Sequence, residues 1–180
     1  MITSMSSLFR YNLKTSEQIV SLARELKVVQ DYMYIQQMRF GSRILYSCDL
    51  KVDAEQAMIP AFTLQPVVEN AYSHGLKSRE EGGRILLRAW MQDKVLVLTV
   101  ADNGKGMNKE ELDAVQAKIA QSEQTGRSIG LGNIFRRIRA MYQDGNVEIY
   151  SKKDVGTVVK IQIRHKEVGE HDVPCVGGGR

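Results

Sequence analysis

Apolar residues recur at helical spacing across residues 21–40. The repeating positions are Leu22, Leu26, Val29, Met33 and Phe40. Their i, i+4, i+7, i+11 spacing predicts an amphipathic helix, with Ser21 suited to cap its start. Val28, Tyr32 and Ile35 form a second apolar side. A helix that is apolar on two sides is expected to pack between two bodies.

Shorter patterns predict five strands and two further helices. The strands are expected at residues 44–50, 84–91, 94–101, 147–151 and 157–163, and the helices at residues 62–74 and 133–142. Residues 95–100 are almost continuously apolar, as in a central strand covered on both faces. Residues 102–132 are polar and rich in glycine, with a short helical patch near 110–119. An irregular segment of this length is usually functional, and we expect it to form a lid.

Composition narrows the class of protein. The chain has 180 residues, of which 43% are hydrophobic and 26% charged, enough for one domain with a core. Two widely separated cysteines exclude a disulfide scaffold and fit a reducing compartment. No apolar run approaches the roughly 20 residues that span a bilayer. The formal net charge of +4 is compatible with phosphate-bearing ligands but is weak evidence for nucleic acid.

The first candidate site lies on the helix expected at residues 62–74. If its apolar side faces the core, Asn70 and His74 share an open face one turn apart. An amide oxygen suits Mg²⁺, and Glu69 adds a carboxylate nearby. Taken alone, the same residues also fit an ordinary polar helix end.

The second candidate follows the apolar strand directly, in the sequence Asp102-Asn-Gly104-Lys-Gly106. A carboxylate at the end of a buried strand is a selective acceptor, for example for an adenine amino group. Two glycines permit unusual backbone angles and close approach. A simple tight turn is the alternative interpretation.

Two weaker signals come later in the chain. Gly130-Leu131-Gly132 precedes a predicted helix, where free backbone N–H groups suit phosphate oxygens. Thr157 opens the last strand, where its hydroxyl could reach a buried carboxylate or a water molecule. Neither signal is informative by itself.

The order of these four features resembles the ATP site of the GHKL superfamily, which includes histidine kinases, gyrase-type ATPases, Hsp90-type chaperones and MutL-type proteins. The sequence contains no GxxxxGK[ST] motif, so it does not belong to a P-loop enzyme. Three segments carry a narrower resemblance, to the LytS/YesM-type sensor histidine kinases. They are Leu8-Phe9-Arg10-Tyr11-Asn12-Leu13 with residues 32–40, Leu64-Gln65-Pro66-Val67-Val68-Glu69-Asn70-Ala71 with His74-Gly75, and Ser128-Ile129-Gly130-Leu131-Gly132-Asn133 with Arg137.

This resemblance implies a fold and a set of roles. The fold would be an α/β two-layer sandwich (the GHKL or Bergerat fold), whose mixed, largely antiparallel sheet carries helices on one face. A helical extension at the N-terminus would lie outside this body. ATP and Mg²⁺ would be the ligands, with Asn70 holding the metal. The remaining implied roles are His74 and Lys77 near the phosphates, Asp102 on the adenine amino group with Thr157 in support, Gly104 and Gly106 beside the adenine, Gly130, Leu131 and Gly132 at the phosphates, and Glu69 as a catalytic group that polarises the acceptor imidazole.

The resemblance also implies partners and an arrangement of domains. The family accepts phosphate on the histidine of an Asn-Pro-His-Phe motif, and none of His74, His165 and His171 lies in one. We therefore interpret the chain as the cytoplasmic catalytic part of a membrane-anchored sensor. Residues 1–41 would end the dimerisation and phosphoacceptor region, residues 42–167 would bind ATP, and residues 168–180 would form a disordered tail. The expected partners are the phosphoacceptor segment, a response regulator receiver domain and a second copy in the full-length protein, but no nucleic acid.

Two other functions remain open at this point. The first is a GHKL ATPase, an anti-sigma-type serine kinase or a nucleotide-gated binding module. Hydrolysis would be favoured by a general base one helical turn before Asn70, but that position is Pro66, which cannot act as a base. The second is an interaction domain with a decayed site, which the intact Asn70 and Asp102 argue against.

Overall fold

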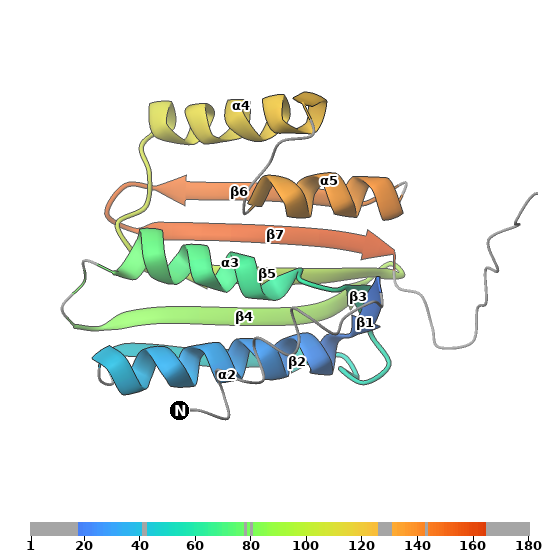
Figure 1. Ribbon diagram of the computed structural model, residues 1–180, viewed down its shortest axis with the longest axis horizontal. Coiled ribbons are helices and arrows are strands. Elements are labelled where there is room, and N and C mark those ends of the chain that lie inside the picture. The colour runs from blue at the N-terminus through green and yellow to red at the C-terminus, as the bar shows by residue number, and fades with distance from the viewer. Residues whose placement is uncertain are drawn as a thin grey trace, which may run out of the picture.

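A five-stranded mixed sheet is the centre of the fold (Figure 1). The computed structural model describes residues 18–40, 43–77, 79, 81–125, 131–142 and 144–164. The strand order is β2 (Ile44–Lys51), β4 (Gly83–Gln92), β5 (Val95–Asp102), β7 (Gly156–Arg164) and β6 (Asn146–Lys152). The β2–β4 pair is parallel and the other three pairs are antiparallel. All five predicted strands are confirmed, and so is the mixed, largely antiparallel sheet.

Alternation along the strands separates the two faces of the sheet. In β4, Ile85 and Leu87 are fully buried, whereas Arg84 and Arg88 on either side of them are exposed. In the central strand β5, both Val97 and Leu98 are fully buried, which agrees with its continuously apolar sequence. The strand therefore lies in the middle of the sheet, with its carboxyl end at Asp102.

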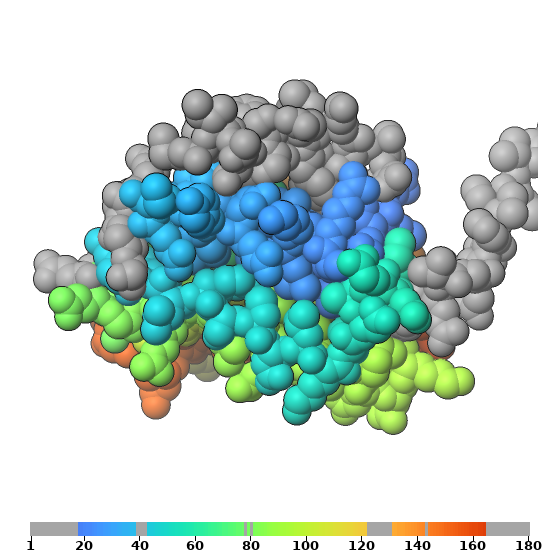
Figure 2. Space-filling model, turned by 90° about the horizontal axis from the view of Figure 1, so that it is seen from below, coloured from blue at the N-terminus to red at the C-terminus, as the bar shows by residue number. Residues whose placement is uncertain are grey.

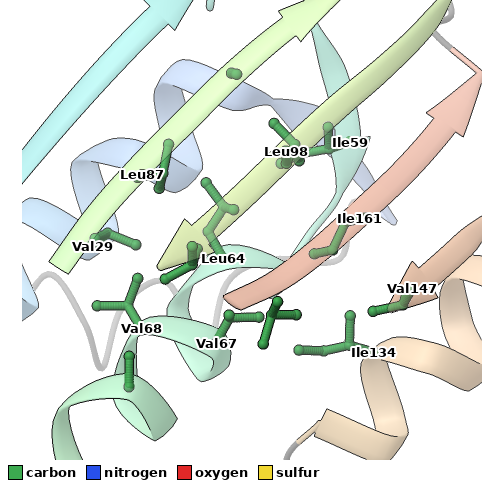
Figure 3. Close-up of a cluster of buried hydrophobic side chains, with 14 of the residues drawn as sticks. Val29, Ile59, Leu64, Val67, Val68, Leu87, Leu98, Ile134, Val147 and Ile161 are labelled. Carbon is green, nitrogen blue, oxygen red and sulfur yellow. The ribbon is translucent and has the colours of Figure 1, made fainter. Parts of the chain in front are cut away.

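Three helices pack on one face of this sheet. They are α2 (Leu22–Phe40), α3 (Leu64–Asn70) and α5 (Leu131–Met141). Figure 3 shows the layer between helices and strands, where Val29, Leu64 and Ile134 of the helices face Leu87, Leu98 and Ile161 of the strands. These residues belong to one hydrophobic cluster that joins the helices to the sheet. The expected two-layer sandwich is confirmed.

The long helix α2 belongs to this sandwich, so the expectation that it lies outside the ATP-binding body is wrong. Its apolar positions Leu22, Leu26, Val29 and Met33 all lie in the main core. Figure 2 shows α2, in blue, lying along the cyan segment that contains β2 and the following loop. Two short strands that the sequence pattern does not reveal, β1 (Ile19–Ser21) and β3 (Met58–Pro60), pair antiparallel at the start of the helix. The expected cap is confirmed, since the Ser21 hydroxyl accepts the N–H of Arg24 at 3.3 Å.

The helix predicted over residues 62–74 changes its winding at Ala71. The α-helix α3 ends at Asn70 and a π-helix, η1 (Ala71–Leu76), continues from it. Apolar periodicity does not reveal such a widened turn, and π-turns inside helices often mark functional sites. Gly75 therefore lies within the helix rather than at its end.

The segment expected to be irregular contains the 17-residue helix α4 (Lys109–Thr125). Its start is capped reciprocally: the Asn108 side chain accepts the N–H of Glu111 at 2.8 Å, and the Glu111 carboxylate accepts the N–H of Asn108 at 2.8 Å. Among the α4 side chains that the structure describes, only Leu112, Val115 and Ile119 pack in or against the core. This weak amphipathicity is the reason that the pattern indicates only a short helical patch.

Several expectations fall outside the described residues. They concern residues 8–13, Gly130, His165, His171 and the tail at 168–180. None of the helices in the described ranges combines the length and hydrophobicity of a bilayer-spanning segment.

Candidate functional site

Asp102 ends the central strand at the edge of the helical layer. Its Oδ1 accepts the N–H of Gly104 at 2.8 Å, and the backbone N–H of Thr157 also hydrogen-bonds to the carboxylate. Burial raises the pKa of this carboxyl above its usual value, and the two N–H donors partly offset that rise. The result is a half-buried anionic acceptor with a fixed orientation, as the sequence predicts.

Three glycines allow backbone to crowd around this carboxylate. A Cβ on Gly75 would lie 2.7 Å from Oδ1 of Asp102, and a Cβ on Gly104 would lie 2.3 Å from the carbonyl oxygen of Gly75. A Cβ on Gly156, at φ +139°, would lie 1.9 Å from the carbonyl oxygen of Asp102. Real Cβ atoms do not tolerate such distances, so η1, the turn after β5 and the start of β7 converge here only because all three positions are glycine.

The turn after β5 is also tied to the β6–β7 hairpin. The Ser151 hydroxyl accepts the N–H of Met107 at 2.9 Å and lies 2.9 Å from the hydroxyl of Thr157. Gly106, at φ +59°, lies so close to Lys152 that a Cβ would lie 1.9 Å from that residue's carbonyl oxygen. Thr157 is therefore beside Asp102 as expected, but its backbone N–H contacts the carboxylate while its hydroxyl faces Ser151.

The second half of the candidate site lies on α3. The Asn70 amide donates from Nδ2 to the carbonyl oxygen of Pro66 at 2.7 Å, so its remaining polar atom, Oδ1, could accept from or coordinate a ligand. Glu69 accepts a hydrogen bond from the Gln65 amide at 2.7 Å. Tyr32 on α2 lies close to Glu69. Burial, and after it the negative charge of Glu69, raise the pKa of the Tyr32 phenol. The Glu69 carboxylate is thus held near α2 by neighbouring side chains.

The remaining predicted site residues are placed to different degrees. His74 and Lys77 are exposed, on η1 and immediately after it, downstream of Asn70 on the same helix. Leu131 opens α5, and Gly132 is buried in its first turn. Gly130 lies outside the described residues, so the geometry of the glycine box is defined only from Leu131 onwards.

The described residues fit a nucleotide with one metal ion better than a metal site made by protein alone. Within the described ranges, no group of three His, Cys, Asp or Glu side chains could hold a metal. Mg²⁺ is commonly held by one or two protein oxygens together with phosphate oxygens and water. Asn70 Oδ1 can supply such an oxygen, and the half-buried Asp102 carboxylate can accept a hydrogen bond from a base.

Sequence reasoning missed three residues at or behind this site. Gly75 was predicted only as part of a motif, yet its backbone contacts both Asp102 and Gly104. Ser151 links the turn after β5 to Thr157, and Glu25 binds the start of α3 from α2. The position of Gly75 immediately after His74 was a usable signal, whereas nothing local to Ser151 or Glu25 indicates these contacts.

Comparisons with known proteins agree with this geometry. Residues 61–167 match the family described as histidine kinase-, DNA gyrase B-, and HSP90-like ATPases, and residues 1–44 match a histidine kinase family. The chain is 30% identical over 175 residues to the sensor protein LytS of Staphylococcus saprophyticus, and 31% identical over 164 residues to the sensor histidine kinase YesM of Bacillus subtilis. These matches cover 96% and 91% of this chain, respectively.

The chain spans less than a third of the length of these curated relatives, 29% of LytS and 27% of YesM. Its fold is similar to the solved structure of the histidine kinase ThkA in complex with the response regulator protein TrrA. That likeness has a TM-score of 0.56 at 13% identity and covers 92% of this chain and 48% of ThkA.

Gly75→Ala should weaken adenine-nucleotide binding roughly tenfold or more, because the new Cβ must displace the Asp102 carboxylate. The backbone angles of Gly75 suit alanine, and overpacking of this kind costs about 1–3 kcal/mol of unfolding free energy. Isothermal titration with ADP tests the effect. Ser73→Ala, on the same π-helix with an exposed side chain, is the matched control. Wild-type ADP affinity in Gly75→Ala would exclude Gly75 from the site.

Proposed function

Since this chain belongs to the family of histidine kinase-, DNA gyrase B- and HSP90-like ATPases, we propose that it is the ATP-binding catalytic part of a two-component sensor histidine kinase. It binds Mg-ATP and presents the γ-phosphoryl group to a histidine on a separate segment. The observation that carries this proposal is the half-buried Asp102 carboxylate, oriented by backbone N–H groups where Gly75 and Gly104 bring η1 and the turn after β5 against it. The similarity to sensor histidine kinases over nearly the whole chain supports it.

In this proposal Asp102 selects the base. Its carboxylate accepts a hydrogen bond from the adenine amino group, while the N–H groups of Gly104 and Thr157 keep it oriented. A half-buried charged acceptor discriminates strongly, because a base without the matching donor leaves it unpaired. Gly104 and Gly106 border the adenine.

The phosphate end is held by α3, η1 and the start of α5. Asn70 supplies Oδ1 to Mg²⁺, which neutralises phosphate charge and orients the γ-phosphoryl group. His74 and Lys77 lie near the phosphates. Leu131 and Gly132 offer backbone N–H groups at the start of α5, and Gly130, the residue before them in the sequence, is proposed to act with them. Catalysis is then mainly positioning and charge neutralisation, with Glu69 polarising the incoming imidazole.

The residue one helical turn before Asn70 favours phosphoryl transfer to histidine over hydrolysis of ATP. A water-activating base would be expected one turn earlier, at Pro66, whose carbonyl instead accepts the Asn70 amide. We further propose that the full-length protein is a membrane-anchored homodimer whose phosphohistidine passes its phosphate to a response regulator receiver domain. The solved complex of ThkA with TrrA supports a partner of that kind.

Asn70→Ala should remove most of the improvement that Mg²⁺ brings to ATP binding and should leave metal-free ADP binding nearly unchanged. The reason is that the substitution deletes the protein's metal ligand without touching Asp102. Titrations of ATP and ADP with and without Mg²⁺ measure both quantities. Asn146→Ala, at the opposite end of the sheet, is the control. An equal loss with and without metal would refute the metal role.

Asp102→Asn should lower ATP affinity roughly tenfold or more, because a buried polar mismatch costs about 1–3 kcal/mol. The amide introduced by the substitution places an NH₂ donor opposite the adenine amino group, which is itself a donor, so the two groups cannot hydrogen-bond. For the same reason, the wild-type protein should bind GTP much more weakly than ATP. Asp93→Asn, in the exposed β4–β5 turn, should leave both affinities unchanged. Equal affinity of the wild type for ATP and GTP would exclude Asp102 from base selection.

Incubation with labelled ATP should yield bound nucleotide but no acid-labile, base-stable phosphoprotein. A phosphate acceptor must come in line with the γ-phosphoryl group. His74 is held on η1, the same helical segment that is proposed to bind the nucleotide, so it cannot reach that position. Addition of a separate helical segment that carries an Asn-Pro-His-Phe motif should give labelling of that segment. An Asn-Pro-Gln-Phe version is the control. Stoichiometric labelling of the chain alone that His74→Gln abolishes, with ATP binding intact, would contradict the assignment of His74.

A further inference from the structure

A buried carboxylate from α2 holds the start of the helix that carries Asn70. Glu25 has no exposed surface. Its Oε1 accepts the N–H of Phe62 at 2.8 Å, and its Oε2 accepts those of Thr63 and Leu64 at 2.9 and 2.8 Å. Both oxygens thus receive backbone donors from a segment 37 to 39 residues away in sequence.

The start of α3 has no capping side chain of its own. Thr63 occupies the cap position, but its hydroxyl donates to the carbonyl oxygen of Pro60 at 2.6 Å and makes no capping bond. The first N–H groups of a helix need acceptors, and a negative charge there also stabilises the helix dipole. Glu25 therefore performs the task of an N-cap residue from another helix.

A short chain of contacts connects this cap to the proposed metal ligand. Glu25 holds the backbone that enters the first turn of α3, and Pro66 belongs to that turn. The Pro66 carbonyl oxygen then accepts the Asn70 amide at 2.7 Å, which sets the side chain so that Oδ1 is presented. A displaced first turn would therefore change where Oδ1 points.

Other helices hold the same region. The Arg137 guanidinium, on α5, donates to the carbonyl oxygen of Phe62 at 2.6 Å, so one residue is held from both sides. Phe62 has a φ of +59°, a conformation that a non-glycine residue adopts only where its surroundings impose it. Farther along, Tyr32 on α2 packs edge to face on Tyr72 of η1, with ring centroids 6.2 Å apart. Helix α2 thus contacts the α3–η1 segment both at the start of α3 and in the first turn of η1.

We propose that Glu25 is a positioning residue: its carboxylate, acting through the first turn of α3 and the Pro66 carbonyl, sets the orientation of Asn70 toward the metal and phosphates. This inference rests on the proposed function, since it assigns Glu25 a role in the Mg²⁺-dependent part of ATP binding. It also makes the start of α3, where Glu25 binds, the point through which α2 acts on metal binding.

Glu25→Gln tests this role. The glutamine oxygen can still accept the N–H groups of Thr63 and Leu64. Its NH₂ group then faces the N–H of Phe62, so that hydrogen bond is replaced by two opposed donors. The Mg²⁺ enhancement, defined as the ratio of ATP dissociation constants without and with Mg²⁺, should fall roughly twofold to thirtyfold, the range that loss of a helix cap spans. Adenosine affinity should stay within a factor of about two, because the Asp102 pocket is built from β5, β7 and η1. Glu55→Gln, on an exposed loop, is the matched control and should change neither quantity.

A second background separates the failure of this inference from the failure of the proposed function. In Asn70→Ala, Glu25→Gln should cause no further loss of the Mg²⁺ enhancement, since both act on one ligand. If Asn70→Ala itself leaves the enhancement intact, the proposed metal role fails. If Asn70→Ala removes it but Glu25→Gln does not reduce it, or reduces adenosine and Mg-ATP binding equally, Glu25 is only structural. Should Glu25→Gln not fold, Arg137→Gln, which releases Phe62 from the other side, must show the same selective loss or the inference is wrong.

Discussion

Backbone packed against backbone at the end of β5 is the constraint on which the rest of the site depends. The turn after Asp102, the π-helix η1 and the start of β7 approach so closely that Gly75, Gly104 and Gly156 have no room for a Cβ. This packing removes water from part of the Asp102 carboxylate and raises its pKa, while backbone N–H groups keep it oriented. The Asp102 carboxylate keeps one orientation because the N–H groups of Gly104 and Thr157, which donate to it, belong to the backbone and cannot rotate away.

The close packing at the end of β5 also explains why the α3–η1 segment changes from α-helical to π-helical winding. An α-helix running on from Asn70 would carry Gly75 along a different path, whereas the wider π-turns bring its backbone against Asp102. The α3–η1 segment is in turn held at its start by Glu25 and beside η1 by the Tyr32–Tyr72 contact. The two halves of the proposed site therefore share supports: the sheet and its glycine turns hold Asp102, and helix α2 contacts both the start of α3 and the π-helix that carries Gly75.

Local patterns account for most of the architecture. Alternation and continuous apolar runs predict all five strands of the sheet, and the i, i+4 spacing predicts α2 and α5, because such periodicities arise wherever one face of an element is buried. They fail where burial is slight or local geometry is unusual. The weakly amphipathic α4 is predicted as a short patch, the π-turns after Asn70 as ordinary helix, and the three-residue strands β1 and β3 are not predicted at all.

The candidate site divides in the same way. Local sequence is enough to predict the residue types of the proposed site and their order: an asparagine on a helix, an aspartate after a buried strand, and glycines near them. The packing of the folded chain is needed to show that Gly75 contacts Asp102, that the Thr157 backbone rather than its hydroxyl contacts the carboxylate, and that α2 lies within the sandwich. The same packing is needed to identify Glu25, because the apolar spacing of residues 22–40 marks it only as a polar position on a helix. Hydrogen bonds between residues nearly 40 positions apart leave no local trace in sequence, because they depend on how the finished elements pack and not on the periodicity within either one.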